Sequence, residues 1–173
     1  MQSRDLLTDG FERIAQEVHA VLDGASADVL EHRPDPESNT AAWLVWHLTR
    51  VQDDHVASVA GTEQRWTVGG WAEKFGLPFP ADATGYGQSA DDVAAVRVDA
   101  DDLRGYFDEV HAATLAYLER VTDDDLDAVV DTAWDPPVTL GVRLVSVLSD
   151  DLQHVGQAAY VRGLAMRAVS GAR

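Results

Sequence analysis

The sequence predicts an all-α protein, a four-helix bundle with one long crossover loop. Four long stretches repeat apolar residues at spacings of three and four, which is typical of amphipathic helices. No stretch alternates apolar and polar residues for long enough to support a sheet. The chain has 173 residues, of which 46% are hydrophobic, and this fits a single domain over residues 1–173 with a sizeable core.

The first two long helices are expected in the N-terminal part of the chain. Residues 4–23 carry one apolar stripe, and residues 39–61 carry a broader one that Asn39 or Thr40 can cap and Gly61 can close. Between them, "SADVLEHR" indicates a short helix or turn, and the two prolines of "RPDPES" prevent a continued helix. The apolar positions are Leu7, Phe11, Ile14, Val18 and Val21, followed by Leu44, Val45, Leu48, Val51, Val56 and Val59.

A long irregular segment and two further helices follow. Residues 62–98 are rich in glycine, proline and aromatic residues, and only "SADDVAAVR" near their end predicts a short helix. A loop this long inside a compact domain is often functional. The third long helix is expected over residues 99–121 and the fourth from Thr139 to about residue 168. Between these two, "TDDDLDAVV" predicts a short helical turn and "DTAWDPPVT" a loop.

The composition excludes several classes of function. A net charge of −17, from 30 acidic and 13 basic residues, makes nucleic acid and anionic membranes poor partners. There is no apolar run near the roughly 20 residues that span a bilayer and no signal peptide, so a cytoplasmic protein is expected. The absence of cysteine excludes a protein thiol nucleophile, and sulfur chemistry would need a small molecule to supply the sulfur.

Asp150, His154 and Gln157 form one polar stripe on the last helix. On a helical wheel His154 lies about 40° from Asp150, and Gln157 lies about 20° away on the other side. An aliphatic group on the opposite side of the helix would form the core and leave this stripe in water. A second apolar group, within about 80° of Asp150, favours burial of the stripe instead. The opposite group is Leu144, Leu148, Leu152, Val155 and Ala159, and the nearer group is Val147, Ala158, Val161 and Ala165.

The same stripe also predicts a metal site. A carboxylate and an imidazole at positions i and i+4 can chelate one ion, and zinc-type catalytic sites use three protein ligands with one open position. His47 in "LVWHLTR" is the best third ligand because it lies at the edge of the apolar face of the second helix. The candidate ligands are therefore His47, Asp150 and His154. Two histidines and one carboxylate suit Zn²⁺, Ni²⁺, Fe²⁺ or Mn²⁺ better than Ca²⁺ or Mg²⁺.

Weaker candidates surround these three residues. Asp54 shares the face of His47 and can orient that imidazole, as metal-bound histidines usually require. Asp151 is a weaker ligand choice because it lies about 100° from Asp150 on the wheel. Gln157 can support a ligand by a hydrogen bond or face water. Of the remaining histidines, His55 is a further candidate ligand or supporting group, and His111 is interpreted as a packed or rim residue. His19 and His32 are interpreted as surface residues.

The segments "NTAAWLVWHLTRVQDDH" and "DDLQHVGQAAYVRGL" resemble the second and last helices of the DinB/YfiT-like superfamily. In that superfamily the second helix typically carries one metal-binding histidine. The last helix typically carries a ligand, three further residues, a histidine and then x-Gly-Gln. The resemblance covers most of the chain and implies a metal triad of His47, Asp150 and His154. The commonest members have histidine where Asp150 stands, whereas the branch of mycothiol-dependent enzymes, including maleylpyruvate isomerase, has a carboxylate.

The resemblance implies a metal-dependent thiol S-transferase. A divalent metal, zinc or otherwise nickel, iron or manganese, would bind mycothiol or a related low-molecular-weight thiol as a thiolate that attacks a small electrophile. A stand-alone transferase for detoxification is expected rather than the isomerase, which has an additional C-terminal domain. The resemblance also suggests a homodimer. In the long loop, four aromatic residues can line a substrate pocket or simply pack onto the bundle, namely Trp66, Trp71, Phe75 and Tyr86.

Two other functions stay open at the level of the sequence. The same open metal site can activate water, which would make the protein a metal-dependent hydrolase. Alternatively, the chain is a metal-binding bundle without enzymatic activity. Thiol-independent turnover would favour the hydrolase, and stability that survives loss of the triad would favour the bundle.

Overall fold

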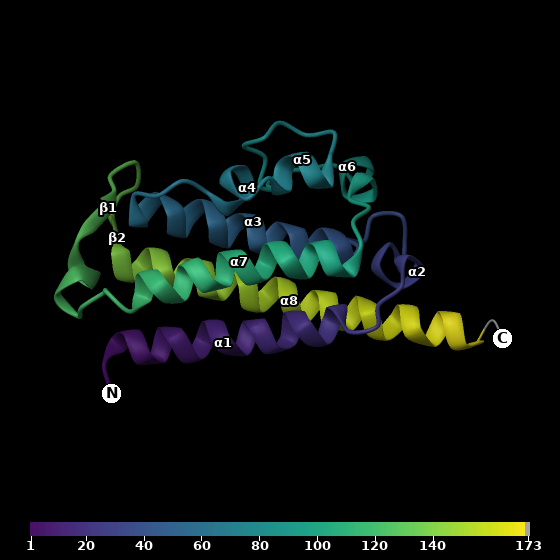
Figure 1. Cartoon of the computed structure of the whole chain (residues 1–173), viewed down its shortest axis with the longest axis horizontal. Helices are drawn as coiled ribbons and strands as arrows, with labels where there is room; N and C mark the ends of the chain where they lie inside the picture. The colour runs from purple at the N-terminus through teal and green to yellow at the C-terminus, as the bar shows by residue number, and fades with distance from the viewer. Residues whose placement is uncertain (172–173) are drawn as a thin grey trace.

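Four long helices lie side by side in an elongated bundle (Figure 1). The computed structural model describes residues 1–171, with side chains as far as Val169. The bundle comprises α1 (Ser3–Leu22), α3 (Ala41–Ala60), α7 (Ala100–Leu118) and α8 (Leu140–Gly171). Helices α7 and α8 each pack against both α1 and α3. The all-α prediction is confirmed. No helix in the described part of the chain is long and apolar enough to cross a lipid bilayer.

The predicted capping residues set the ends of the helix that carries His47. Thr40 Oγ1 accepts a hydrogen bond from the amide of Trp43 at 3.0 Å, which satisfies one of the free donors at the start of α3. Gly61 ends the helix with a φ of 66°, a left-handed conformation that glycine adopts without steric cost. The register of α3 is therefore determined by local chemistry at both of its ends.

Helix α3 is covered on all sides over its first half. Every residue from 41 to 50 is buried, including His47 and Arg50. The bundle covers one side, and the crossover between α3 and α7 runs over the other (Figure 1). Polar side chains in this half of α3 must consequently find partners within the protein.

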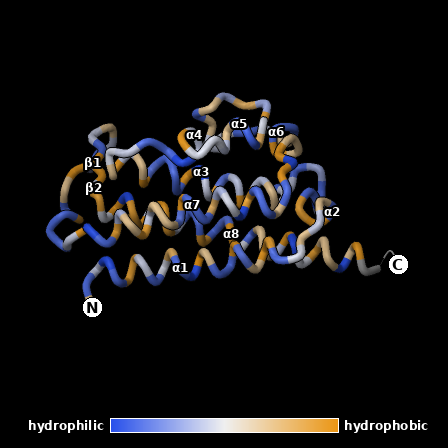
Figure 2. The backbone as a smooth tube through the Cα atoms, viewed as in Figure 1, coloured by the Kyte–Doolittle hydropathy of each residue, from blue (hydrophilic) through white to orange (hydrophobic). Residues whose placement is uncertain are grey.

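The buried face of α8 takes residues from both apolar groups of the helical wheel. In the group opposite Asp150, Leu144 and Val155 are buried, but Leu152 is 48% exposed and Ala159 is also exposed, so the interpretation of that whole group as core was wrong at these two positions. The apolar residues nearer to Asp150 are buried as well, because α1 and α3 pack against α8. Apolar residues are interspersed with polar ones along every long helix, and the neighbouring helices decide which of them are covered (Figure 2). The buried apolar residues of α8 are Leu140, Leu144, Val147, Val155, Ala158, Val161 and Ala165.

The crossover contains three short helices, α4 (Arg65–Val68), α5 (Trp71–Phe75) and α6 (Ala90–Ala95). Helix α6 confirms the prediction from "SADDVAAVR". Helices α4 and α5 are too short to show a helical period, so the sequence does not reveal them. Their aromatic side chains pack together with those of the bundle, in a cluster of Trp46, Trp66, Trp71, Phe75 and Tyr106.

Small elements close the two ends of the bundle. Helix α2 (Ala27–Leu30) follows α1, and the 3₁₀ helix η1 (Asp124–Asp127) follows α7. Strands β1 (Val129–Asp131) and β2 (Val138–Thr139) then pair in antiparallel fashion. The expectation of no sheet was therefore wrong at this one place. Two strands of two or three residues are too short to show the alternation that identifies a strand.

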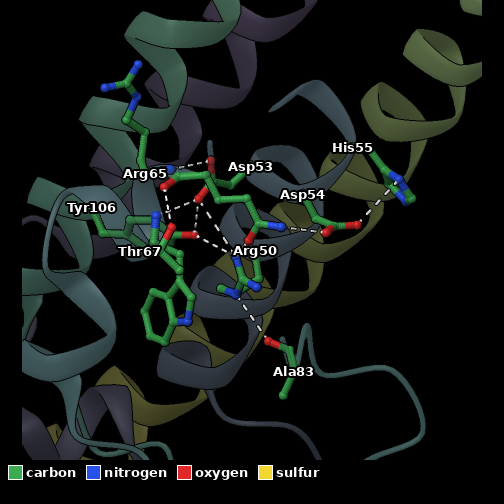
Figure 3. A network of polar contacts seen from close by, with 10 residues as sticks. Arg50, Asp53, Asp54, His55, Arg65, Thr67, Ala83 and Tyr106 are labelled. Carbon is green, nitrogen blue, oxygen red and sulfur yellow. Dashed lines mark hydrogen bonds and ion pairs between the residues drawn. The ribbon is translucent and has the colours of Figure 1, made fainter. Parts of the chain in front are cut away.

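A buried ionic network fastens the crossover to the bundle (Figure 3). The Asp53 carboxylate of α3 accepts hydrogen bonds from the amides of Arg65 and Trp66, at 2.9 and 2.8 Å. The Tyr106 hydroxyl of α7 donates to the same carboxylate at 2.9 Å. Arg50 Nη1 lies 3.7 Å from Asp53 Oδ2, and both side chains are almost fully buried. One carboxylate therefore joins α3, α4 and α7.

Replacing Asp53 by alanine should destabilise the protein strongly. The substitution leaves the Tyr106 phenol and two amides without their acceptor and the buried Arg50 without its counter-ion, and breaking such a buried pair costs about 3–5 kcal/mol. Urea unfolding of D53A against the wild type measures this loss. D9A is the matched control, because it removes an aspartate from an exposed pair with Arg13 and should leave the unfolding midpoint nearly unchanged. Equal midpoints for D53A and D9A would contradict the role given to the network.

His111 of α7 is a packed residue, as the sequence suggested. Its ring stacks on Phe107 with centroids 5.6 Å apart, and its Nδ1 is enclosed without a hydrogen-bond partner among the described residues. Burial lowers the pKa of His111 below its usual value, although the charges of Glu12 and Asp108 oppose the shift. The neutral ring is therefore the form that the fold prefers.

This burial predicts a loss of stability on acidification. As the pH falls through about 6.5, the unfolded chain takes up a proton at residue 111 before the folded protein does, and this uptake favours unfolding. H111F lacks this proton site. We expect the thermal midpoint of H111F, relative to the wild type, to be higher at pH 5.5 than at pH 7.5. A difference that does not change with pH would contradict this interpretation.

Candidate metal centre

The three predicted ligands meet between α3 and α8. His47 comes from α3, while Asp150 and His154 lie one turn apart on α8. Each residue offers one ligand atom, and these atoms all lie within 4.8 Å of one another. The rings of His47 and His154 meet edge to face with their centroids 4.7 Å apart. The structure thus brings together all three residues of the predicted triad as a group that can bind a metal ion.

Hydrogen bonds at Nδ1 orient both imidazoles, and Nε2 of His154 lies 3.5 Å from Asp150 Oδ1. His47 Nδ1 contacts the carbonyl oxygen of Thr84 at 2.5 Å, and because a carbonyl only accepts, this nitrogen carries the proton. His154 Nδ1 lies 3.2 Å from Gln157 Oε1, and because a carbonyl oxygen accepts, this nitrogen also carries a proton. Gln157 thus has both roles considered from the sequence, because it is exposed to water and also contacts the His154 ring. Metal-bound histidines in proteins are oriented in this way.

The electrostatics of the group favour the ligand forms of His47 and Asp150. Burial lowers the pKa of His47, and the nearby His154 lowers it further, whereas the Thr84 carbonyl opposes the shift. Burial by itself raises the pKa of Asp150, but the contact with His154 and the charges of both histidines outweigh it, so the pKa is lowered. The same contact raises the pKa of His154 against the effect of burial. A neutral His47 therefore faces an ionised Asp150.

An enclosed carboxylate oxygen indicates that a cation fits this group. Asp150 Oδ2 is buried and has no hydrogen-bond partner among the described residues. Leaving such an oxygen unpaired is costly, and a cation held by the same carboxylate would offset that cost. Two imidazole nitrogens and one carboxylate oxygen suit a divalent transition metal ion. Three protein ligands leave a coordination position open, as in catalytic sites of the zinc type.

A segment of the crossover, residues 83–88, is strapped across α3 at this point. Three side chains of α3 bind it, and their spacings of four and three place them on one face of the helix. His47 binds the Thr84 carbonyl, Arg50 Nε donates to the Ala83 carbonyl at 3.1 Å, and Trp43 Nε1 donates to Gln88 Oε1 at 2.7 Å. The ring of Trp43 also stacks on that of His47, with centroids 4.7 Å apart. The strap, residues 83–88, therefore holds one ligand in place.

The strap lies this close to His47 because residue 85 is glycine. Gly85 has a φ of +102°, and a Cβ atom there would lie 2.5 Å from His47 Nδ1 and 3.1 Å from Trp43 Cζ2. Any larger residue would have to move the imidazole or the strap.

A cavity of about 310 Å³ borders the centre and is lined by His47 and Asp150 among other residues. Tyr86, which is 96% exposed, also lines it. Of the four aromatic residues proposed from the sequence as a substrate pocket, only Tyr86 reaches this cavity. The other three pack in the aromatic cluster under the crossover, namely Trp66, Trp71 and Phe75.

Two aspartates near the triad have other roles than those considered from the sequence. The prediction that Asp54 orients His47 was wrong, since Asp54 accepts a hydrogen bond from Gln64 at 2.7 Å and the Thr84 carbonyl orients the ring. Asp151 is fully buried, and neither of its carboxyl oxygens has a partner among the described residues. Burial, together with the charge of Asp150, raises the pKa of Asp151 well above 3.8 and favours its protonated form. Asp151 is not part of the group that can hold a metal.

Sequence reasoning missed the residues that the crossover brings to the centre. Thr84, Gly85 and Gln88 lie about 40 positions from their partners on α3, as the separations of 37 and 45 residues show. No periodicity links such distant positions. The one available indication was a glycine-rich stretch, "ATGYGQ", inside an unusually long loop.

Comparisons with known proteins agree with this fold. The sequence profile of the DinB superfamily matches residues 11–158, so the chain belongs to the DinB superfamily. A crystal structure described as that of a conserved protein of a locus from Enterococcus faecalis is 29% identical in sequence. It superimposes with a TM-score of 0.89 over 96% of this chain and 98% of its own. No curated protein matches the chain.

Replacing Gly85 by alanine should weaken metal binding. The new methyl group would displace the His47 ring, and disturbing a partner behind a metal ligand typically costs about 10–100-fold in affinity. Competition for Zn²⁺ against a chromophoric chelator measures this affinity. G87A is the matched control, because Gly87 also has a positive φ, +71°, but nothing lies within 4 Å of its added Cβ. An equal loss in both variants would show that backbone strain, not the contact with His47, is responsible.

Proposed function

We propose that this member of the DinB superfamily is a metal-dependent thiol S-transferase. The observation that carries the proposal is the group of two histidines and one half-buried carboxylate, whose ligand atoms lie within 4.8 Å of one another beside a cavity large enough for a small molecule. Zinc is the preferred metal, with nickel, iron and manganese as the others that suit this donor set. The proposed co-substrate is mycothiol or a related low-molecular-weight thiol, and the acceptor is a small electrophile.

The protein's own residues would position the reactants. A bound divalent metal would stabilise the thiolate form of a thiol and make it nucleophilic near neutral pH. The strap, residues 83–88, holds the His47 ring, and Gln157 holds the His154 ring, so that neither ligand has to reorganise. Asp150 supplies the negative charge that balances the cation. The chain has no cysteine, so the nucleophilic sulfur would come from the co-substrate.

The carboxylate at position 150 favours the thiol reaction over hydrolysis. Within the superfamily, the sequence of this chain resembles the branch that has a carboxylate at this position, and that branch uses mycothiol. A homodimer and a cytoplasmic location, which the same resemblance and composition suggest, stay predictions. The acidic surface, with a net charge of −17, continues to argue against nucleic acid as a partner.

Elemental analysis of the triad variants tests the proposal. We expect stoichiometric metal in the protein purified from its native host, and its loss in H47A, D150A and H154A. H32A serves as the control histidine, because His32 lies outside the group and should retain the metal. Addition of N-acetylcysteine to a small electrophile, 2-cyclohexen-1-one, should disappear with the metal. Turnover that needs metal but no thiol would replace the transferase by a hydrolase, and stable variants with no activity in any form would indicate a binding bundle.

A further inference from the structure

The cavity beside the centre follows the groove between α3 and α8. Its lining residues advance along α3 from His47 to His55 and go back along α8 from Asp150 to Ser146. His55 lies eight residues after His47, which corresponds to about 12 Å along the helix axis. The cavity therefore leads from the triad to the imidazole of His55, which is not part of the triad. The lining residues are His47, Val51, Asp54, His55, Thr84, Tyr86, Ser146 and Asp150.

The contacts of His55 leave it a neutral imidazole with its proton on Nε2. Arg143 Nη1 lies 3.4 Å from His55 Nδ1, and Asp54 Oδ2 lies 3.8 Å from the same nitrogen. Because a guanidinium only donates, the shorter contact favours Nδ1 as an acceptor. Burial and the charge of Arg143 lower the pKa of His55, which also favours the neutral ring. Nε2 makes no hydrogen bond within the described chain and is not among the enclosed polar atoms without partners. His55 lines the cavity and its Nε2 is not enclosed by protein, so this nitrogen can bind a ligand there.

The charges around His55 are already paired within the protein. Arg143 Nη2 donates to Asp131 Oδ2 of β1 at 2.7 Å, so the guanidinium is occupied on its other side. Asp54 accepts from Gln64 and lies 3.8 Å from His55 (Figure 3). The cavity lining contains two carboxylates, Asp54 and Asp150, and no lysine or arginine. With a cation on Asp150, Asp54 is the charge that remains beside His55, and it disfavours an anionic group there, whereas an uncharged oxygen can accept from the His55 N–H.

We propose that His55 binds the acceptor substrate, donating its Nε2–H to the oxygen of an uncharged carbonyl compound whose reactive carbon lies toward His47 and Asp150. The inference rests on the proposed S-transferase and narrows its electrophile to small neutral α,β-unsaturated carbonyl compounds. A volume of about 310 Å³ is at the lower end of the roughly 300–1,000 Å³ typical of ligand pockets, which limits the substrate to a small one.

The chemistry of conjugate addition makes such a donor useful. The thiolate sulfur forms a bond to the β-carbon, the π electrons of the carbon–carbon double bond move toward the carbonyl, and negative charge develops on its oxygen. A proton from solvent then completes the α-carbon. A fixed N–H donor aimed at this oxygen binds the developing charge more strongly than the neutral carbonyl. Arg143 fixes the tautomer of His55 and is thus a positioning residue for the donor.

Binding of cyclohexanone, the unreactive analogue of 2-cyclohexen-1-one, tests this assignment without any chemical step. Zinc-loaded, ¹⁵N-labelled protein is titrated with cyclohexanone, and the dissociation constant is read from chemical shifts. We expect H55F to weaken binding about fivefold, the size of one neutral hydrogen bond. H55Q, whose amide N–H reaches a similar position, should stay within about twofold of the wild type. H32F is the control, and circular dichroism checks that each variant is folded.

Several results would overturn the assignment. They are no saturable binding to the wild type, equal affinities of H55F and the wild type, or an equal loss in H55F and H55Q, which would implicate the ring rather than its N–H. Addition of N-acetylcysteine to 2-cyclohexen-1-one is measured separately and reports on the transferase itself. His55-dependent binding of cyclohexanone without turnover would contradict the transferase proposal and support the ligand site at His55. Turnover with an unchanged KM in H55F would remove this site and keep the transferase.

Discussion

The hydrogen bond between the His47 imidazole and the carbonyl oxygen of Thr84 is the interaction on which the arrangement of the centre depends. It joins a buried helix to a loop nearly 40 residues further along the chain. Because a carbonyl can only accept, the bond determines which ring nitrogen carries the proton and which one faces the other two candidate ligands. It also brings Tyr86 to the rim of the cavity. The loop is thus part of the centre and not only its cover.

The polar residues in the middle of α3 follow from the same constraint. A helix covered on one side by a bundle and on the other by a crossover cannot leave polar groups unpaired without a large cost. Arg50 and Asp53 accordingly bind backbone groups of the crossover, and His47 binds another. Side chains that a soluble helix would normally turn to water here hold the loop in place. The stability of the loop and the geometry of the candidate ligands are therefore coupled through one helix.

Two carboxyl groups on α8 have buried oxygens without a hydrogen-bond partner in the described chain, and the two groups differ in charge. Asp150 is kept ionised by the two histidines, although one of its oxygens is enclosed without a partner. The neighbouring Asp151 is fully enclosed, and its burial raises the pKa and favours the neutral acid. A divalent cation would pair with the ionised oxygen of Asp150 and would also be bound by the two nearby imidazole nitrogens. A neutral acid one residue further on adds no charge to this group.

Periodicity and capping residues in the sequence were sufficient to predict the four long helices, because both depend only on residues close together in the chain. Thr40 and Gly61, which cap α3, are examples. The spacing of Asp150 and His154 likewise determined that they share a face. Only the tertiary structure decided that Asp150 and His154 are half-buried while Gln157 stays exposed, since apolar residues lie on both sides of α8 and the packing of α1 and α3 covers part of each. It alone also brought Thr84 and Gly85 against His47. Contacts between residues so far apart in the chain arise from packing, and no local pattern encodes them.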